Sequence, residues 1–475
     1  MKKVILSAAA LMFGAVTFAQ QDVNHAERQE ASQVTNHSSD VDANRADVDQ
    51  WNTSQKAFVQ QVGERNSAQV DQSDGAYGGT GGNQAMIYQS GPYSLSGPWY
   101  NLQYESEAED NQAEVNQAGT TNESALYQRG SNNDARSDQG LDGSASDNKV
   151  AIYQGDFDNY PYSGNSGNDA FAKQEGSENS SLIAQDDNNN DAMTAQDGDG
   201  NKVYVTQTSR QDGSVDEGQM ALVEQYGDMN ESTVAQDGRG ARNNATTYQL
   251  GNNNKAWQKQ YNTSDDAGDE NTATITQGTL GYIPSDYAIA IQDQRGEDNE
   301  ASITQYDGNE VASNYAQQDQ DGDDNDAAIT QENVFEGHDN FAKQIQDGNY
   351  NEAIIGQKGD GHKAQQWQKG NNNFAESHQQ GKDHKAFVWQ RYDNNYAFTN
   401  QNNIGNDALV VQSGGQSATV DQLDGSGNEA TVFQSGPYGM PYGAPQHCDF
   451  DSPIGTPSVP TPDDLTLADP CPDCN

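Results

Sequence analysis

Small or apolar residues alternate with polar ones along most of this chain, in segments of seven residues that recur every eleven. In the segment 299–305, Ala301 and Ile303 lie at alternate positions between Asn299 and Gln305, and the residues between them are polar. Successive side chains of a β-strand point to opposite faces, so these four residues share one face. Each segment therefore predicts a strand of about seven residues, with an amide side chain at each end of its inward face.

The residues between the segments favour turns. Asp-Gly dipeptides recur there, for example at Asp237-Gly238 and Asp347-Gly348, and Asp and Gly are typical turn residues. A helical interpretation fails because Gly recurs at this short period and the apolar residues do not repeat at three and four. The pattern thus predicts a strand and a turn in every eleven residues.

The repeat is easiest to follow in the block 340–412, where its phase is unbroken. Degenerate copies bring the total to about thirty units between residues 44 and 434. We expect the inward Asn, Ala and Gln of this block to stack on their own copies: Asn340, Ala342, Gln346, Asn351, Ala353, Gln357, Gln368, Asn373, Ala375, Gln379, Gln390, Asn395, Gln401, Asn406 and Gln412.

Two eleven-residue units make one 22-residue coil of strand, turn, strand and turn. Stacked coils predict an all-β fold, an amyloid-like parallel β-solenoid in which two sheets face each other across a thin core. Ala at the third position lets the sheets approach closely, and Asn and Gln form hydrogen-bonded ladders from coil to coil. About fifteen coils at about 4.8 Å each would extend roughly 70 Å.

Composition alone favours disorder. Hydrophobic residues make up 32% of the 475 residues and the formal net charge is -48, and chains of this kind bury too little apolar surface to offset their entropy. The repeat changes that conclusion, because buried amides that bond to their own copies are satisfied without water.

The remaining segments define the domain organisation. Residues 1–19 have a basic start, a short apolar run and small residues before the expected cleavage point, as in a secretory signal peptide. Residues 20–43 are a degenerate repeat or an export segment, 44–434 the repeat solenoid, and 435–475 a tail with Pro and Cys. Phase breaks at 73–82, 90–110, 155–167, 261–270 and 278–285 predict inserted loops. No segment after residue 19 is apolar enough to span a membrane, so we expect a secreted or surface-bound protein.

The repeat resembles that of the curlin family, the subunits of bacterial curli fibres. The match covers about four-fifths of the chain after residue 19 and is seen in the segments 346–357, 117–128 and 236–249. The resemblance implies secretion by a bacterium, export of an unfolded chain by a curli-type outer-membrane export and nucleation machinery, and self-assembly into a pilus-like functional amyloid. It also implies a role in adhesion and biofilm, with contacts to extracellular matrix or to host and abiotic surfaces.

Three functional interpretations stay open. The first is a fibre-forming protein, either the main subunit or a nucleator. The second is a monomeric β-solenoid adhesin that binds a partner or polysaccharide. The third is a β-helix enzyme acting on polysaccharide, which we consider remote because the chain lacks catalytic motifs such as Gly-x-Ser-x-Gly and His-Glu-x-x-His.

The outward positions carry what is particular to this chain. Outward residues 22 positions apart become neighbours, so Trp367 should lie beside Trp389, and Phe374 beside Tyr396 with Phe398 close by. One interpretation makes these aromatics a contact surface. The other is that aromatic ladders stabilise the sheet.

Candidate chemistry is otherwise sparse, and we expect no catalytic residue and no cofactor. Cys448, Cys471 and Cys474 are the only cysteines; the spacing of Cys471 and Cys474 suits zinc weakly, and a disulfide or free thiols are the alternative. The acidic turn 319–324 lacks the EF-hand pattern, so solvated turns are favoured over a calcium site. His362 and His384 replace the repeat's Asn and are ladder residues. The acidic composition excludes ordinary nucleic-acid binding.

The net charge leads to a first prediction. Stacking chains of charge -48 on one another should be slowed by repulsion, which salt screens. Self-assembly followed by thioflavin fluorescence should accelerate with added salt, with divalent cations or on acidification. Assembly kinetics that respond to none of these would contradict charge control.

Overall fold

A computed structural model describes residues 44–51, 54–73, 82–90, 93–96, 101–104, 108–140, 145–155, 166–209, 218–238, 242–262, 270–278, 285–307, 313–333 and 339–436, with Gly439, Pro445, Cys448 and Phe450. All of them belong to one compact unit, residues 36–475. The expected signal peptide, the segment 20–43 and the tail beyond Phe450 lie outside the described residues. Within the described ranges the chain forms strands and no helix.

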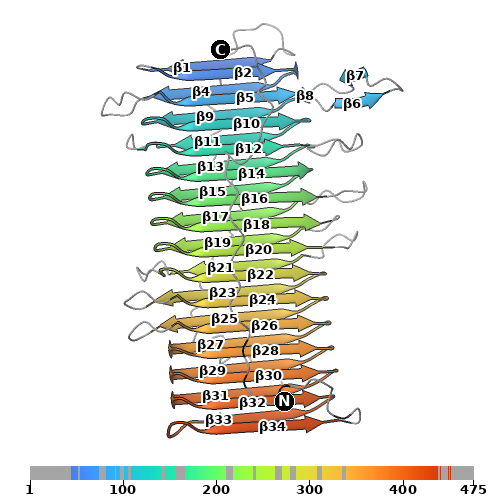
Figure 1. Cartoon of the computed structure of the whole chain (residues 1–475). Coiled ribbons are helices and arrows are strands. Elements are labelled where there is room, and N and C mark those ends of the chain that lie inside the picture. Colours follow the sequence, from blue (N-terminus) through green and yellow to red (C-terminus); the bar gives the residue numbers. More distant parts are fainter. Residues whose placement is uncertain are drawn as a thin grey trace, which may run out of the picture. The chain divides into compact units, whose positions relative to one another are not determined.

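Two large sheets contain fifteen strands each (Figure 1). We call the first one sheet A. Its strands, in spatial order, are β1 (Arg45–Gln50), β4 (Ser67–Ser73), β9 (Gln112–Ala118), β11 (Asp134–Gln139), β13 (Asp169–Glu175), β15 (Asp191–Asp197), β17 (Met220–Tyr226), β19 (Asn244–Leu250), β21 (Thr272–Gln277), β23 (Glu300–Asp307), β25 (Asp326–Asn333), β27 (Glu352–Asp360), β29 (Phe374–Lys382), β31 (Tyr396–Ile404) and β33 (Ser417–Gln422).

The second large sheet, sheet B, takes the alternate strands. In spatial order they are β2 (Lys56–Gln61), β5 (Gln84–Ser90), β10 (Glu123–Arg129), β12 (Lys149–Gln154), β14 (Ser180–Asp187), β16 (Lys202–Ser209), β18 (Glu231–Gly238), β20 (Lys255–Tyr261), β22 (Ile289–Arg295), β24 (Tyr315–Asp321), β26 (Phe341–Asp347), β28 (Lys363–Lys369), β30 (Lys385–Arg391), β32 (Asp407–Ser413) and β34 (Glu429–Ser435).

These sheets confirm the predicted fold class, a parallel β-solenoid. Every pairing within them is parallel, and identical repeat positions face each other, as with Ala342 on Ala364 and Gln346 on Gln368. Ladder residues of successive coils lie 22 positions apart in the unbroken block. The separation rises to 45 at Gln72 and Gln117, where inserted residues lie between two coils. Insertions therefore lengthen the connections and leave the register intact.

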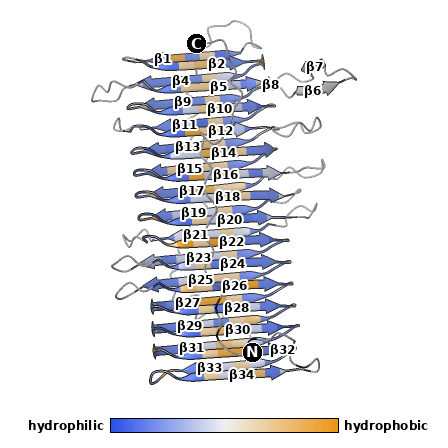
Figure 2. Ribbon diagram, in the orientation of Figure 1, coloured by the Kyte–Doolittle hydropathy of each residue, from blue (hydrophilic) through white to orange (hydrophobic). Residues whose placement is uncertain are grey.

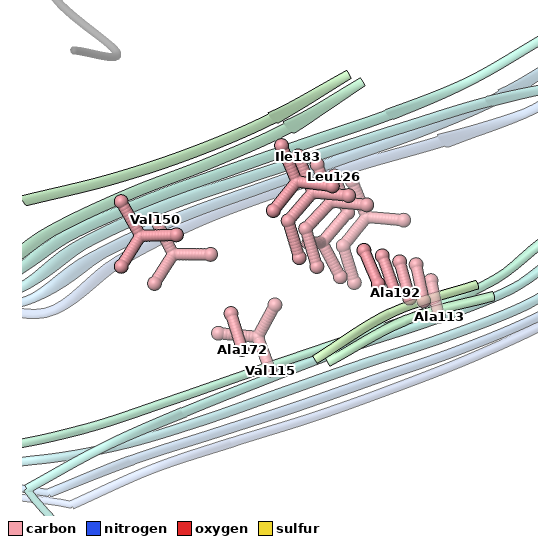
Figure 3. Close-up of a cluster of buried hydrophobic side chains, with 14 of the residues drawn as sticks. Ala113, Val115, Leu126, Val150, Ala172, Ile183 and Ala192 are labelled. Carbon is pink, nitrogen blue, oxygen red and sulfur yellow. The ribbon is translucent and has the colours of Figure 1, made fainter. Parts of the chain in front are cut away.

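The core is a thin layer in which large side chains oppose small ones. Figure 3 shows Leu126 and Ile183 of sheet B stacked opposite Ala113 and Ala192 of sheet A, all of them buried. At the left of the view, Val150 of sheet B faces Ala172 of sheet A, with Val115 beside Ala172. Colouring by hydropathy accordingly places apolar residues in the middle of the strands and polar residues near the turns (Figure 2). Pairing an aliphatic residue with Ala lets the two sheets pack closely across a thin core.

One insertion differs from the prediction. The segment 90–110, expected to be a loop, contains an antiparallel pair of short strands, β6 (Tyr93–Ser96) and β7 (Asn101–Tyr104). It also contains β8 (Ala108–Glu109), which pairs with β3 (Gly63–Glu64). This segment lacks the Asn-to-Gln spacing that would let it join a large sheet, and its β6–β7 part satisfies its backbone by pairing with itself. Residues 74–81, 156–165, 263–269 and 279–284 of the other predicted loops lie outside the described residues.

The turns depend on glycine where successive coils touch. Gly348 has φ 127°, a conformation that side chains disfavour. A Cβ atom there would lie 2.3 Å from the carbonyl oxygen of Gly370 in the next coil. Gly405 offers a comparison, because its φ is 66° and nothing lies within 4 Å of the Cβ position.

A second prediction follows from this contrast. Gly348→Ala should lower the stability of its coil by roughly 1–3 kcal/mol more than Gly405→Ala does, because only the first adds a clash to the backbone strain. Solenoid coils unfold locally, so amide hydrogen exchange of β26 and β27 is the suitable measurement for the first variant, and that of β31 and β32 for the second. Equal losses of protection in the two variants would contradict the clash.

Candidate functional site

Glutamine side chains form continuous hydrogen-bonded ladders through the interior. In sheet B, the Gln346 amide donates to the Oε1 atom of Gln368 at 3.0 Å, Gln368 to Gln390 at 3.0 Å, and Gln390 to Gln412 at 2.9 Å. Gln346 Nε2 also donates to the Asp326 carbonyl on the facing sheet at 2.9 Å. The ladder therefore joins coil to coil and sheet to sheet, and it always donates toward the C-terminal end.

Asparagine side chains form a second ladder of opposite direction. The backbone amide and the Nδ2 atom of Asn373 both donate to the Oδ1 atom of Asn351, at 3.0 and 3.1 Å. Asn395 makes the same pair of bonds to Asn373, at 3.0 and 2.9 Å. Here the later coil donates to the earlier one. Each Asn therefore satisfies the backbone at the start of the next coil's strand.

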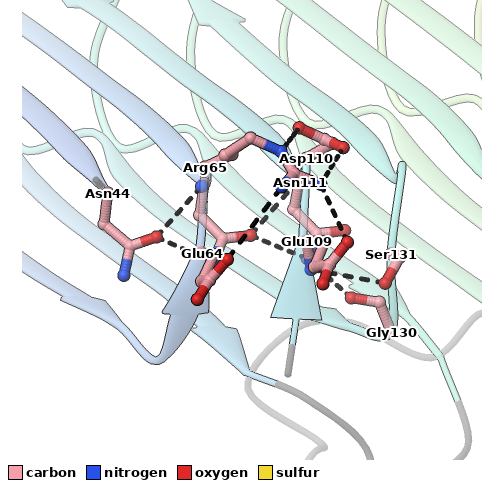
Figure 4. Close-up of polar contacts among 9 residues, drawn as sticks. Asn44, Glu64, Arg65, Glu109, Asp110, Asn111, Gly130 and Ser131 are labelled. Carbon is pink, nitrogen blue, oxygen red and sulfur yellow. Dashed lines mark hydrogen bonds and ion pairs between the residues drawn. The ribbon is translucent and has the colours of Figure 1, made fainter. Parts of the chain in front are cut away.

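Figure 4 shows the asparagine ladder in the first coils. Asn66 donates to the Oδ1 atom of Asn44, and Asn111 continues the ladder by donating to Asn66. Beside it, the Arg65 guanidinium donates to Glu109 at 2.8 Å and to Asp110 at 2.8 Å. This contact lowers the pKa of Asp110, because the Arg65 hydrogen bond favours the carboxylate. The arginine thus joins two coils that are separated by a long insertion.

All fifteen ladder residues named from the sequence lie in the interior, each at most 2% exposed. The sequence interpretation missed a third ladder. It replaces the central aliphatic residue of sheet B with glutamine over five successive strands, with donor–acceptor distances between 2.9 and 3.1 Å. Its members are Gln258, Gln292, Gln318, Gln344 and Gln366. The signal in the sequence was a second Gln two positions before the repeat's own.

The turns carry a ladder that sequence reasoning also missed. The backbone amide of Asp323 donates to the Oδ1 atom of Asn349 at 3.1 Å, and that of Asn349 donates to Asn371 at 2.8 Å. The backbone amide of Asn371 donates in turn to Asp393 at 2.8 Å. Asn and Asp are thus selected in these turns by hydrogen bonding between coils. Asp323, which belongs to the acidic turn 319–324, takes part in this ladder.

His362 and His384 replace asparagine in the ladder of sheet B. Their rings are buried and stack with centroids 5.1 Å apart. The backbone amide of His384 donates to the Nδ1 atom of His362 at 3.3 Å, and that of Asn406 donates to the Nδ1 atom of His384 at 3.1 Å. Each Nε2 atom lies near a carbonyl oxygen, Lys358 O for His362 and Gln380 O for His384. This geometry needs neutral rings that accept at Nδ1 and donate at Nε2.

Electrostatics agree with that tautomer. Burial, with repulsion from His384, lowers the pKa of His362 to about 4. Burial also lowers the pKa of His384. Protonation would place a hydrogen on Nδ1, where it would face the backbone N–H that now donates a hydrogen bond to this atom. The histidines are therefore structural ladder groups that stay neutral at neutral pH, and their protonation in acid would destabilise the fold.

The outward aromatics lie where the sequence put them, but their exposure differs. On sheet B, Trp367 and Trp389 are neighbours in an edge-to-face contact at 6.0 Å. On sheet A, Phe374 and Tyr396 stack at 4.9 Å, and Phe398 is the in-register neighbour of Glu376 beside them.

Trp389 differs from the other outward aromatics in its exposure, and a role for these aromatics as a contact surface stays a prediction. Trp367 is 37% exposed and Tyr396 is 42% exposed, whereas Trp389 is only 6% exposed. Trp389 is buried in a cluster with Leu409 and Val411 of β32, against which Cys448 and Phe450 of the tail pack. The tail contact could not be foreseen from the repeat.

Like charges face each other along the outside. Glu300, Asp326 and Glu352 occupy one in-register column on sheet A. On sheet B, burial and the in-register Asp293 raise the pKa of Asp319. Such columns cost stability at neutral pH, because neighbouring carboxylates repel across one strand spacing.

The two ends of the stack expose strand edges. Among the described residues, no strand pairs with the outer edges of β1 and β2 at one end, or of β33 and β34 at the other. Val48, which is inward by its position in β1, is 41% exposed. Strand edges of this kind are templates for pairing with another chain.

Metal and membrane features are absent from the part of the chain that the structure describes. No group of three or more His, Cys, Asp and Glu residues there could hold a metal ion. The Cys448 thiol contacts the Ala408 carbonyl oxygen at 3.5 Å, and Cys471 and Cys474 lie outside the described residues. No helix within the described ranges is long and apolar enough to cross a membrane.

No protein-family model matches the chain, and no curated protein matches it either. Membership in the curlin repeat family therefore stays a prediction from the sequence.

The histidine ladder gives a third prediction, a pH dependence. The unfolded chain binds a proton at His362 near pH 6.5 and the folded chain only near pH 4, so stability falls as the pH drops between these values. The loss amounts to about 3 kcal/mol below pH 4. His362→Asn restores the repeat and should remove much of the acid sensitivity, measured as hydrogen-exchange protection of β28 and β30 relative to wild type from pH 7.5 to 4.5.

His378→Asn is the matched control, because His378 lies on the outer face beside Glu376. Both variants keep the columns of carboxylates on the outer faces. The effect of protonating those carboxylates is therefore the same in both variants and cancels when their acid sensitivities are compared. The ladder explanation is refuted by a His362→Asn protein whose acid sensitivity equals that of wild type.

Proposed function

We propose that the protein is a structural, non-enzymatic protein that assembles outside the cell into a curli-like amyloid fibre, as a subunit or a nucleator. In this role it supports adhesion and the biofilm matrix, and it reaches the surface of a bacterium through a curli-type export and nucleation machinery. The proposal rests chiefly on one observation: the two ends of the stack are complementary in strand direction and in ladder polarity.

The first end of the stack presents acceptors. Gln50 donates to Gln72 at 2.7 Å and Gln61 donates to Gln89 at 2.8 Å. The Oε1 atoms of Gln50 and Gln61 therefore lie at the free end of the two glutamine ladders. No described residue donates to these two oxygens. A preceding coil would supply the missing donors, as every interior coil does.

The last end presents donors. Gln401 donates to Gln422 and Gln412 donates to Gln434, at 2.9 and 2.8 Å, so the ladders finish on the amides of Gln422 and Gln434. The described residues that follow β34 turn back toward β32 of the preceding coil. Gly436 donates to the Ser413 carbonyl and Ser413 donates to that of Gly439.

Placing β1 of one copy on β33 of another, and β2 on β34, would continue both sheets in parallel register. Such a contact is head-to-tail and does not close, so it generates an open filament. The glutamine side chains at the two ends gain ladder partners and become buried, and exposed Val48 gains cover, which favours elongation. The monomeric adhesin stays the alternative, supported by the exposed aromatics Trp367 and Tyr396.

The fourth prediction tests the first end directly. Val48→Lys places a charge at the exposed edge of β1, where the undocked chain can keep it solvated. Docking of a second chain would bury this charge without a partner, which is costly. We expect the protein concentration needed for elongation to rise by at least about tenfold, equivalent to 1.4 kcal/mol. Thioflavin kinetics of seeded samples and a cross-β spacing of about 4.8 Å in the fibres are the measurements.

Asp47→Asn is the matched control, because it changes the net charge by the same unit on the outward face of the same strand. Slowing by Val48→Lys alone supports docking at β1. Equal effects of the two variants refute docking at this end, and a wild-type protein that stays monomeric at every concentration favours the adhesin.

A further inference from the structure

We propose that the outer face of sheet B is the docking surface for the chain's own C-terminal segment, residues 437–475, which runs along the stack as a strap. This inference does not depend on fibre formation. It begins with a difference between the two outer faces. Outward positions of sheet A are mostly polar or acidic, whereas those of sheet B form an apolar and aromatic stripe. The buried members of the stripe are Ala151, Tyr153, Leu182, Ile291, Tyr315, Phe341, Phe387, Trp389, Leu409 and Val411.

Burial of the stripe is the second observation. Val411 is 0% and Ile291 1% exposed, although both point away from the facing sheet. At the other outer face, the outward Tyr396 of sheet A is 42% exposed, and the buried apolar residues among its described outward positions are confined to two neighbouring strands, at Met220 and Tyr248. A sheet face that is covered by nothing leaves its side chains accessible, so sheet B has a cover.

Two tail residues identify that cover near the C-terminal coils. The Cys448 thiol lies 3.5 Å from the Ala408 carbonyl of β32. The Phe450 ring lies 6.0 Å from that of Phe387 in β30 and 6.3 Å from that of Phe341 in β26. From Cys448 to Phe450 the chain thus advances from β32 toward β26. It crosses the strands and heads for the N-terminal coils.

The stripe continues ahead of Phe450. Around β12 and β14, Tyr153 and Leu182 are 4% and 1% exposed. The described side chains that pack with them all belong to sheet B. A further segment is needed to account for this burial, and the tail already points toward it.

The length of the tail suffices to reach these strands. Twenty-five residues follow Phe450, and an extended polyproline segment spans roughly 3.1 Å per residue, or about 75 Å in all. The path from β26 to β12 covers seven strand spacings in sheet B, which is about 34 Å at about 4.8 Å each.

The chemistry of the tail matches the stripe. Six of the 25 residues after Phe450 are Pro, and proline-rich segments dock on aromatic grooves without needing backbone partners. The tail has no Lys or Arg and six Asp after Cys448. Outward Lys residues of the chain are concentrated on sheet B, at Lys56, Lys149, Lys202, Lys255, Lys259, Lys343, Lys363 and Lys385. An acidic tail on a lysine-bearing face is therefore favoured by charge.

Carboxyl-to-amine cross-linking of the full chain with a zero-length carbodiimide, under dilute conditions, tests the strap. We expect tail carboxylates such as Asp463 and Asp464 to cross-link to Lys residues of sheet B, for example Lys202 or Lys255. Phe450→Asp should abolish most of these links, and Phe450→Leu should keep them. A mixture of isotope-labelled and unlabelled protein separates links within a chain from links between chains.

A second measurement follows Trp389 as the only tryptophan, with Trp51, Trp99, Trp257 and Trp367 replaced by Phe. Phe450→Asp should raise its acrylamide quenching several-fold while the β-sheet circular dichroism stays unchanged. Phe398→Asp, on sheet A, is the control and should leave the quenching unchanged. Tail links confined to lysines of sheet A such as Lys173 and Lys358, links only between chains, no tail links at all, or quenching that Phe450→Asp does not change would each overturn the proposal.

Discussion

Buried amide side chains control this structure, because each must find a hydrogen-bond partner within the protein interior. Stacking identical residues solves the problem, since the acceptor of one copy meets the donor of the next. Gln346 and Gln368 illustrate it at 3.0 Å, and each such amide also bonds to the opposite sheet. The requirement fixes the register of every coil. A slip of one residue would turn the amides outward and leave the interior polar groups unsatisfied.

The same ladders give the stack a direction. Glutamine amides donate toward the C-terminal end, whereas the asparagine ladder of sheet A donates toward the N-terminal end. The two ends consequently differ chemically, and an end-to-end contact is favoured in one orientation only. Polarity of this kind comes from the interior, so variation of the outward residues does not affect it. The exterior is free to carry other properties, including the strong negative charge.

The two outer faces have diverged for different environments. Sheet A carries columns of like charge such as Glu300, Asp326 and Glu352, which keep that face hydrated. Sheet B carries Trp, Phe and Tyr together with most of the outward lysines, and the ten residues of its apolar stripe are buried. A repeat protein can build such a division because alternate eleven-residue units supply the strands of the two sheets. The outward residues of one sheet can therefore change without changing those of the other.

The sequence by itself determined the fold class, the inward residues and the register, because period-two alternation and eleven-residue spacing leave one arrangement that satisfies Asn340 and Gln346 together. It also placed Trp367 beside Trp389. It did not determine the hairpin of β6 and β7, where the repeat is absent, nor the third glutamine ladder, which departs from the consensus. The burial of Trp389 was decided only by tertiary structure. Phe450 lies more than 60 residues away, and no local pattern reveals which face such a distant segment covers.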